Sequence, residues 1–256
     1  MKELDIGSAP LQSHIPYDPF AERPLPGIQP LDMAAWLIRD EAFAGQMALR
    51  DRLVAERPEA VLAMEPAARP AAEELLELVL GLVAPGAGEI VTRADGVDVP
   101  VNRARPLQTL ARLVQEDLCI LEKRGDEHVM TAAVLCFPAS WRLDEKFGRP
   151  LIDIHEPVTA YDAGIAARVQ RLFDGVRVGM PLWRFNRLWY VDPDLHQPRS
   201  IHERRPKPEP GRGGYLRSER QCLVRLEKTR AVVFSIHTYV MARAAVLAQG
   251  LDPKGS

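Results

Sequence analysis

The hydrophobic pattern of the chain changes near residue 117. Before this point, "AAEELLELVLGLVA" and "LQTLARLVQED" repeat apolar residues at helical spacing. After it, "LCILEK" and "VMTAAVLCF" flank the polar turn "RGDEH", and "QCLVRL" and "AVVFSIHTYV" flank the turn "EKT". Both arrangements are hairpin signals. Helices followed by a mainly antiparallel sheet predict an α+β fold.

Several shorter segments complete the predicted order of elements. Asp32 is placed to cap a helix over residues 33–56. The apolar run "LIDI" at 151–154 predicts a short strand, and "GIAARVQRLFDGV" predicts a helix after it. Apolar and polar residues alternate in "PLWRFNRLWYV", which predicts a strand. The last segment, "ARAAVLAQ", predicts a closing helix.

The pattern predicts one domain preceded by an arm. Residues 1–31 are rich in proline, which prevents a helix there. Residues 32–250 form a single domain, with a helical part at 32–116 and a sheet part at 117–240. No internal repeat and no linker divides it.

Composition excludes several classes of partner. The chain has 256 residues, of which 46% are hydrophobic and 27% are charged, as in ordinary globular proteins. Its net charge of -2 gives no long-range attraction to nucleic acid or to an anionic membrane. The longest apolar runs are too short to span a bilayer, and the N-terminus lacks the features of a signal peptide. We therefore interpret the protein as cytoplasmic.

The three cysteines lie far apart, at Cys119, Cys136 and Cys222. No Cys-x-x-Cys pair is present, so the usual ligands of a zinc knuckle or an iron–sulfur cluster are missing. Buried reduced thiols are the better interpretation. No phosphate-binding glycine loop, nucleophile elbow or His-Glu-x-x-His helix occurs either.

His155 follows the apolar "LIDI" run and precedes Glu156 and Pro157. Packing on one side and a proline on the other would fix its backbone, as a ligand or a catalytic histidine requires. A purely structural histidine is the alternative. His237 shares a strand face with Ser235 and Tyr239, where it either lines a pocket or lies half-exposed at a sheet edge.

Charged residues supply further candidates. Arg184 and Arg187 in "RFNR", and Arg217 and Arg220 in "LRSERQ", lead into apolar strands. Arginine in such places binds carboxylates through paired hydrogen bonds, or it forms internal salt bridges. "QED" at 115–117 lies where a helix gives way to a strand, and it either binds a cation or simply ends the helix.

The segments "VQEDLCIL", "CFPASWRLDEKFGRPLIDIHEPV", "RFN", "LRSERQCLVRL" and "AVVFSIHTYV" occur in this order. Together they resemble the haem-dependent oxidative N-demethylase family, from about Tyr17 to Tyr239. The resemblance implies a PAS-like antiparallel sheet with an inserted helix, additional N-terminal helices, and bound haem b. It also implies a haem-dependent monooxygenase that oxidises a methyl group of a small amine such as dimethylamine with O₂ and releases formaldehyde.

The resemblance also implies partners and site residues. Electrons would come from NADPH through a separate flavin and iron–sulfur reductase, and the chain could form a homodimer. The family's "IH-x-PV" falls on Ile154, His155, Pro157 and Val158, so His155 becomes the expected iron ligand. The remaining expected cofactor-binding residues are Arg184, Asn186, Arg217 and Arg220. The expected substrate-binding and catalytic residues are Glu116, Asp117 and Tyr239.

The sequence departs from the family pattern at two positions. Thr159 stands where the family often has proline, and Arg187 stands where it usually has tryptophan. The alternative function is a haem-binding PAS-type gas or redox sensor without turnover. A third interpretation is a pocket that takes another small ligand and no haem.

Overall fold

The computed structural model describes residues 9–21, 27–155, 163–200, 202–203, 205–209 and 212–251, with the side chains of residues 155 and 163–167 left out. In these parts the helices are α1 (Phe43–Glu56), α2 (Pro58–Val61), α3 (Arg69–Val83), α4 (Pro106–Ala111), α5 (Leu143–Lys146), α6 (Leu151–His155), α7 (Ala163–Gly175) and α8 (Arg243–Ala248). Short 3₁₀ turns span Met33–Ala35 and Pro66–Ala68.

The strands are β1 (Gln29–Pro30), β2 (Leu62–Met64), β3 (Ile90–Thr92), β4 (Asp98–Pro100), β5 (Asp117–Arg124), β6 (Glu127–Val134), β7 (Leu182–Tyr190), β8 (Tyr215–Arg225) and β9 (Val232–Ala242). Seven of them form one antiparallel sheet in the order β1-β7-β8-β9-β5-β6-β2, and β3 pairs with β4 separately. Helices α5–α7 are inserted between β6 and β7. This arrangement confirms the α+β prediction.

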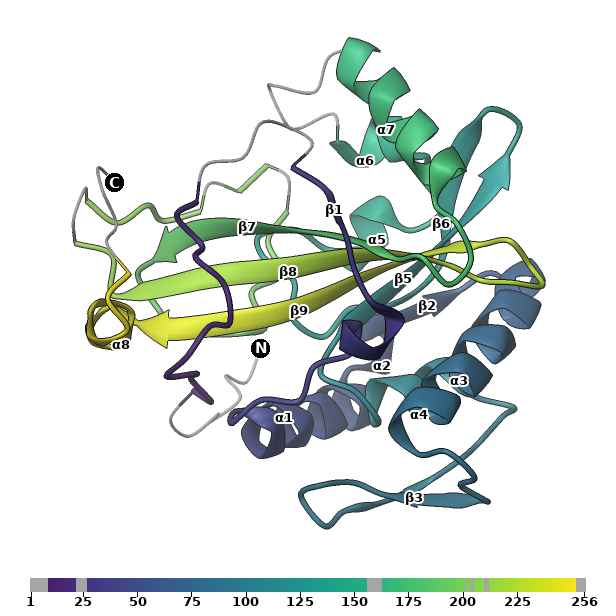
Figure 1. Ribbon diagram of the computed structural model, residues 1–256, viewed down its shortest axis with the longest axis horizontal. Coiled ribbons are helices and arrows are strands. Elements are labelled where there is room, and N and C mark those ends of the chain that lie inside the picture. Colours follow the sequence, from purple (N-terminus) through teal and green to yellow (C-terminus); the bar gives the residue numbers. More distant parts are fainter. Residues whose placement is uncertain are drawn as a thin grey trace.

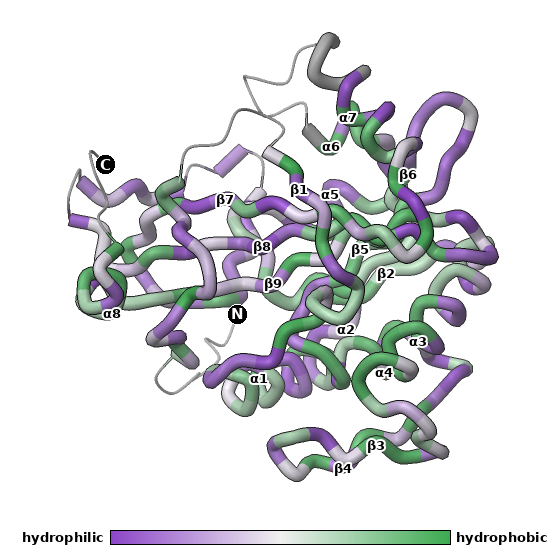
Figure 2. The backbone as a smooth tube through the Cα atoms, viewed as in Figure 1, coloured by the Kyte–Doolittle hydropathy of each residue, from purple (hydrophilic) through white to green (hydrophobic). Residues whose placement is uncertain are grey.

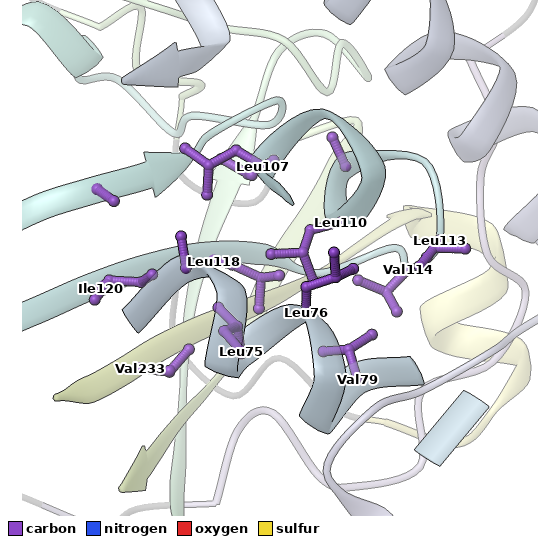
Figure 3. Packing of buried hydrophobic residues seen from close by; sticks show 14 of the residues in the cluster. Leu75, Leu76, Val79, Leu107, Leu110, Leu113, Val114, Leu118, Ile120 and Val233 are labelled. Atoms are coloured by element: carbon purple, nitrogen blue, oxygen red, sulfur yellow. The ribbon is translucent and has the colours of Figure 1, made fainter. Parts of the chain in front are cut away.

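Helices cover both faces of the sheet (Figure 1). On one face, α1, α3 and α4 enclose the largest apolar core, in which Leu76 and Leu110 meet Leu118 and Val233 from the strands (Figure 3). Figure 2 shows the predominantly hydrophobic colouring of α4 and the hydrophilic turn between β5 and β6. On the other face, α5–α7 pack through a second core, in which Leu151 and Phe173 meet Leu223.

The hairpin predictions are confirmed. β5 and β6 turn at Gly125, which has a φ of +61° that glycine adopts without strain. β8 and β9 pair over their full length, and β7, α7 and α8 also form where the sequence predicts them. All three cysteines are buried and free, as expected.

The prediction of one continuous helix over residues 33–56 is wrong. The chain forms a short 3₁₀ turn capped by Asp32, runs irregularly, and becomes helical only at Phe43. Distant side chains hold this irregular segment. The Glu116 carboxylate accepts a hydrogen bond from the backbone of Ile38, and Arg220 donates to the carbonyls of Ala35 and Trp36. These bonds replace those of a continuing helix.

The predicted strand at 151–154 is also wrong, because this segment forms the short helix α6. The exposure pattern explains the difference. Leu151 and Ile154 are 3% and 7% exposed, whereas Ile152 between them is 43% exposed. Apolar burial at a spacing of three is the helical pattern. The third predicted helix is shorter than expected, since α4 ends at Ala111 and Asp117 already belongs to β5.

Candidate functional site

A cavity of about 240 Å³ lies between the sheet and the helices α5–α7. Its walls are mainly apolar and aromatic, as in typical small-molecule sites. The sheet side includes Cys119, Leu121, Met130, Leu182, Trp183, Leu223, Phe234 and Ile236. The opposite side includes Trp141, Leu151, Ile154, Val169, Leu172 and Phe173.

Among the described residues, two cationic side chains line this cavity. The Nε atom of Arg184 is buried and finds no hydrogen-bond partner in the described part of the chain. Lys146, at the end of α5, lies with its Nζ atom 4.6 Å from the centre of the Trp141 ring. Burial lowers the pKa of both groups from their ordinary values. Desolvated cations in an apolar cavity are favourable places for an anionic ligand group.

A carboxylate also belongs to the cavity wall. Glu219 is 7% exposed and lies directly opposite Asn186 in the β7–β8 ladder. Its Oε2 atom accepts hydrogen bonds from Asn186 Nδ2 at 2.9 Å and from Gln221 Nε2 at 3.3 Å. Its Oε1 atom lies 3.6 Å from Arg217 Nε, which is an ion pair without a hydrogen bond.

The predicted cofactor-binding residues do not all reach the cavity. Arg184 lines it, and Asn186 contacts it through Glu219. Arg217 is buried and donates to the backbone carbonyls of Leu195 and Phe137. Arg220 lies on the other face of the sheet, where it donates to the irregular segment before α1. Strand alternation therefore sends Arg220 to the face opposite Arg184 and Arg217, and Arg217 differs from Arg184 because it is bound to backbone carbonyls.

The predicted catalytic residues lie outside the cavity as well. Glu116 is buried on the face covered by the N-terminal helices, where its Oε1 atom lies 3.1 Å from Nδ1 of His237. Nε2 of the same ring lies 3.1 Å from Oδ2 of Asp40. His237 is thus neither half-exposed nor in the cavity, since it is 1% exposed between two carboxylates.

The electrostatics of this buried polar cluster (Asp40, Glu116 and His237) follow from its geometry. Burial disfavours the charged imidazole, but the hydrogen bonds and charges of Asp40 and Glu116 outweigh burial and raise the pKa of His237 to about 9. Burial also opposes ionisation of Asp40, but His237, Gln115 and Gln12 lower its pKa to about 2. The cluster therefore contains a charged histidine at neutral pH.

The cation that Asp117 binds is the guanidinium of Arg50, a residue of the same chain. The Oδ1 atom of Asp117 lies 2.8 Å from Arg50 Nη1, and both side chains are fully buried. The backbone NH groups of Cys136 and Phe137 donate to the same carboxylate. Arg50 also donates to the carbonyls of Ala111, Gln115 and Glu116. This pair fixes the start of β5 against α1.

Tyr239 is buried beside His237, with the two ring centres 4.8 Å apart. Its hydroxyl has no hydrogen-bond partner in the described residues, and burial raises its pKa far above the usual value. Tyr17 from the N-terminal arm packs edge-on against Tyr239 and donates or accepts a hydrogen bond at Ser218. The placement of Tyr239 gives no support for a role at the cavity.

The side chain of His155 lies outside the described residues, and so does Thr159. The backbone of residue 155 ends α6, directly after Ile154, which lines the cavity. Within the residues that can be described, no three His, Cys, Asp or Glu side chains gather as a metal-binding group. No helix of the described chain has the length and hydropathy needed to cross a membrane.

Sequence reasoning missed Lys146, Glu219 and Arg50 as members of these sites. Lys146 approaches the sheet only through the packing of α5, which no local pattern reveals. Glu219 gives a weak signal, because it alternates with Gln221 and Leu223 on one face of a strand, and all three line the cavity. The distance of 67 positions between Arg50 and Asp117 leaves no local signal for that pair.

The chain is an α+β protein whose antiparallel sheet carries an apolar cavity on one face, with desolvated cations in its wall, and these are features of small-molecule sites. The family model described as haem-dependent oxidative N-demethylase, alpha subunit-like, matches residues 27–254. The chain belongs to this haem-dependent family, which confirms the resemblance inferred from its sequence.

Proposed function

We propose that this protein is a haem b-binding monooxygenase component that removes a methyl group oxidatively from a small, dimethylamine-like alkylamine. The observation that carries the proposal is the apolar cavity with Arg184 in its wall, whose buried Nε atom has no hydrogen-bond partner among the described residues, in a chain of the haem-dependent family. A porphyrin needs apolar walls for its ring and cations for its carboxylates. The residues of the cavity fit both requirements.

The chain's residues would share the work of holding haem. Arg184 and Lys146 would pair with the propionates, which would satisfy two desolvated cations. Leu151 and Ile154 of α6 and Phe173 of α7 would pack against the ring. His155 would hold the iron through an imidazole nitrogen, and its position directly after the lining residue Ile154 supports this role.

Bound haem would supply the activation of O₂ and the oxidation of the methyl C–H bond. The overall change consumes one O₂, two electrons and two protons, and it yields the demethylated amine, formaldehyde and water. The cavity would exclude bulk water and orient the amine within apolar walls. The electrons would come from a separate reductase that uses NADPH, flavin and an iron–sulfur centre, consistent with the alpha-subunit-like description of the family.

A PAS-like sheet fits this function. β5 and β6 form a hairpin, the helices α5–α7 follow, and β7–β9 return so that β9 pairs with β5. The cavity lies between this sheet and the inserted helices. The single domain at 32–250 and the arm at 1–31 remain our proposed boundaries, and the cytoplasmic location and the homodimer remain predictions.

Formaldehyde release tests the proposal. The haem-loaded protein, a compatible reductase, NADPH and O₂ should release formaldehyde from dimethylamine in step with NADPH consumption. Absence of formaldehyde across a panel of small secondary and tertiary amines would refute the proposed activity. A sensor without turnover would instead respond spectrally to O₂, CO or NO and not to amines. Arg187, the departure that favours the sensor, stacks over Phe20 at 4.9 Å and does not line the cavity.

A further inference from the structure

We propose that two copies of this chain pair through β3, so that the β3 strand of each copy lies in a surface groove of the other. The β3–β4 hairpin is separate from the seven-stranded sheet and lies below α4 in the view of Figure 1. The groove beside it is distinct from the cavity beneath α5–α7. The inference therefore goes beyond the proposed function and does not depend on haem.

The backbone of β3 has one bonded side and one free side. The carbonyl of Glu89 and the N–H of Arg93 both bond to residues that flank β4. Strand alternation therefore directs the N–H and C=O groups of Ile90 and Thr92 away from β4. Neither backbone has a hydrogen-bond partner in the described part of the chain. A free strand edge of this kind can pair with a strand of another chain.

The outer edge of β4 is less suited to pairing. Asp98 and Pro100 occupy its outward positions, opposite Thr92 and Ile90 in the hairpin. Proline has no N–H to donate to another strand, and a charged side chain at an edge opposes pairing. Of the two edges of this hairpin, β3 is therefore the one that accepts a further strand.

A groove of about 350 Å³ runs beside the free edge of β3. The consecutive residues 91–94 line it, which places it along the edge of the strand rather than over one face. The other walls are mainly apolar and include Leu37, Phe43, Leu82, Val83, Leu113 and Val114. Leu82 and Val83 are 38% and 40% exposed, and Ile90 is 57% exposed. A strand bound in the groove would remove this apolar surface from water.

The charges along β3 are complementary to a second copy of the same strand. In an antiparallel pair centred on Val91, Ile90 of one copy faces Thr92 of the other. The same register places Glu89 opposite Arg93 at both ends of the pair. Opposite charges in facing positions stabilise a strand pair, whereas like charges destabilise it. This complementarity favours a second copy as the occupant of the groove.

Arg39 supplies the available cation for this contact. Arg93 is already paired with Asp51 and Asp95 of its own chain. Arg39 lines the same groove, is exposed, and pairs with no acid among the described residues. Glu89 is exposed as well, and its carboxylate accepts no hydrogen bond from the described chain. The antiparallel register brings Glu89 of each copy to the part of the groove that Arg39 lines.

Sedimentation equilibrium over a dilution series tests the inference. The wild-type protein should approach twice the mass of one chain as its concentration rises. Ile90→Lys should weaken this association at least about tenfold, because lysine at a strand edge opposes pairing. Leu247→Lys is the matched control, since Leu247 is 55% exposed on α8 and its replacement should change nothing.

A charge exchange distinguishes pairing from damage to the hairpin. Arg39→Glu and Glu89→Arg should each weaken self-association about fivefold, because each variant brings like charges together. In an equimolar mixture of the two variants, both contacts of a mixed dimer again join opposite charges. The mixture should therefore associate about as strongly as the wild-type protein. A hairpin that is merely damaged would not recover on mixing.

A wild-type protein that stays monomeric at every concentration would overturn the inference, and the groove would then be open to a different protein. A dimer that Ile90→Lys leaves intact would also overturn it, because that dimer uses another surface. A mixture of Arg39→Glu and Glu89→Arg that associates no better than either variant alone would overturn the antiparallel pairing. Should Ile90→Lys lose its fold by circular dichroism, the wild-type mass and the mixing experiment decide.

Discussion

Arg184 and Arg187 are three residues apart on β7 and serve opposite faces of the sheet. Arg184 lines the cavity beneath α6 and α7, whereas the guanidinium of Arg187 stacks over Phe20 of the N-terminal arm. This difference follows from strand alternation, which sends residues an odd number apart to opposite faces. Position 187, where the family resemblance implies tryptophan, therefore lies away from the cavity.

We predict that Arg184→Met and Lys146→Met each accelerate haem loss about tenfold, because each variant removes a charged partner of a propionate. The rate of haem transfer to excess apomyoglobin measures this loss. Arg187→Met makes the same chemical change on the same strand and should leave the rate unaltered. Equal rates in Arg184→Met and Arg187→Met would place the propionates elsewhere.

We predict that the wild-type protein loses stability as pH rises from about 6.5 to about 9. The unfolded pKa of histidine is about 6.5, and Asp40 and Glu116 raise the folded pKa of His237 to about 9. A raised folded pKa stabilises the protein fully below the unfolded value, and this contribution disappears as pH passes the folded value. The loss should be on the order of 3 kcal/mol.

Urea denaturation at a series of pH values measures this loss. His237→Gln removes the titrating group and should flatten the curve across this pH window, even though the variant is less stable overall. His14→Gln is the control, because His14 is exposed on the arm and its ring is in none of these contacts. A wild-type curve that stays flat to pH 9 would contradict a charged His237.

We predict that Arg50→Met lowers the free energy of unfolding by about 3–5 kcal/mol, because it leaves the buried Asp117 carboxylate without its cation. Arg103→Met is the matched control. Arg103 pairs with Glu77 at the surface, where both side chains are more than half exposed, so its loss should leave the free energy of unfolding nearly unchanged. Chemical denaturation of both variants gives the comparison, and similar losses would argue against a structural role for the buried pair.

Much of the fold could be predicted because its signals are local. The alternating apolar runs and polar turns of β5–β6 and β8–β9 specify hairpins within short stretches of chain. The strand predicted for "LIDI" was wrong, because four residues rich in isoleucine and leucine suit either a strand or one turn of helix. The break before α1 depends on Glu116 and Arg220, which lie far along the sequence.

The candidate site could be predicted only in part. Strand alternation puts Arg184 and Phe185 on opposite faces of β7, but the sequence alone does not say which face carries the cavity. That depends on where α5–α7 pack. For the same reason Glu116 and Tyr239 looked like pocket residues in sequence, whereas the N-terminal helices and arm cover them.

The most direct test of the account is an absorption spectrum of the protein purified from haem-supplemented cells, recorded before and after dithionite and CO. The account predicts a Soret band that shifts with each addition and with dimethylamine. It further predicts that His155→Ala loses the haem while circular dichroism reports an intact fold. A featureless wild-type spectrum, or an unchanged haem content in His155→Ala, would contradict the proposed haem site.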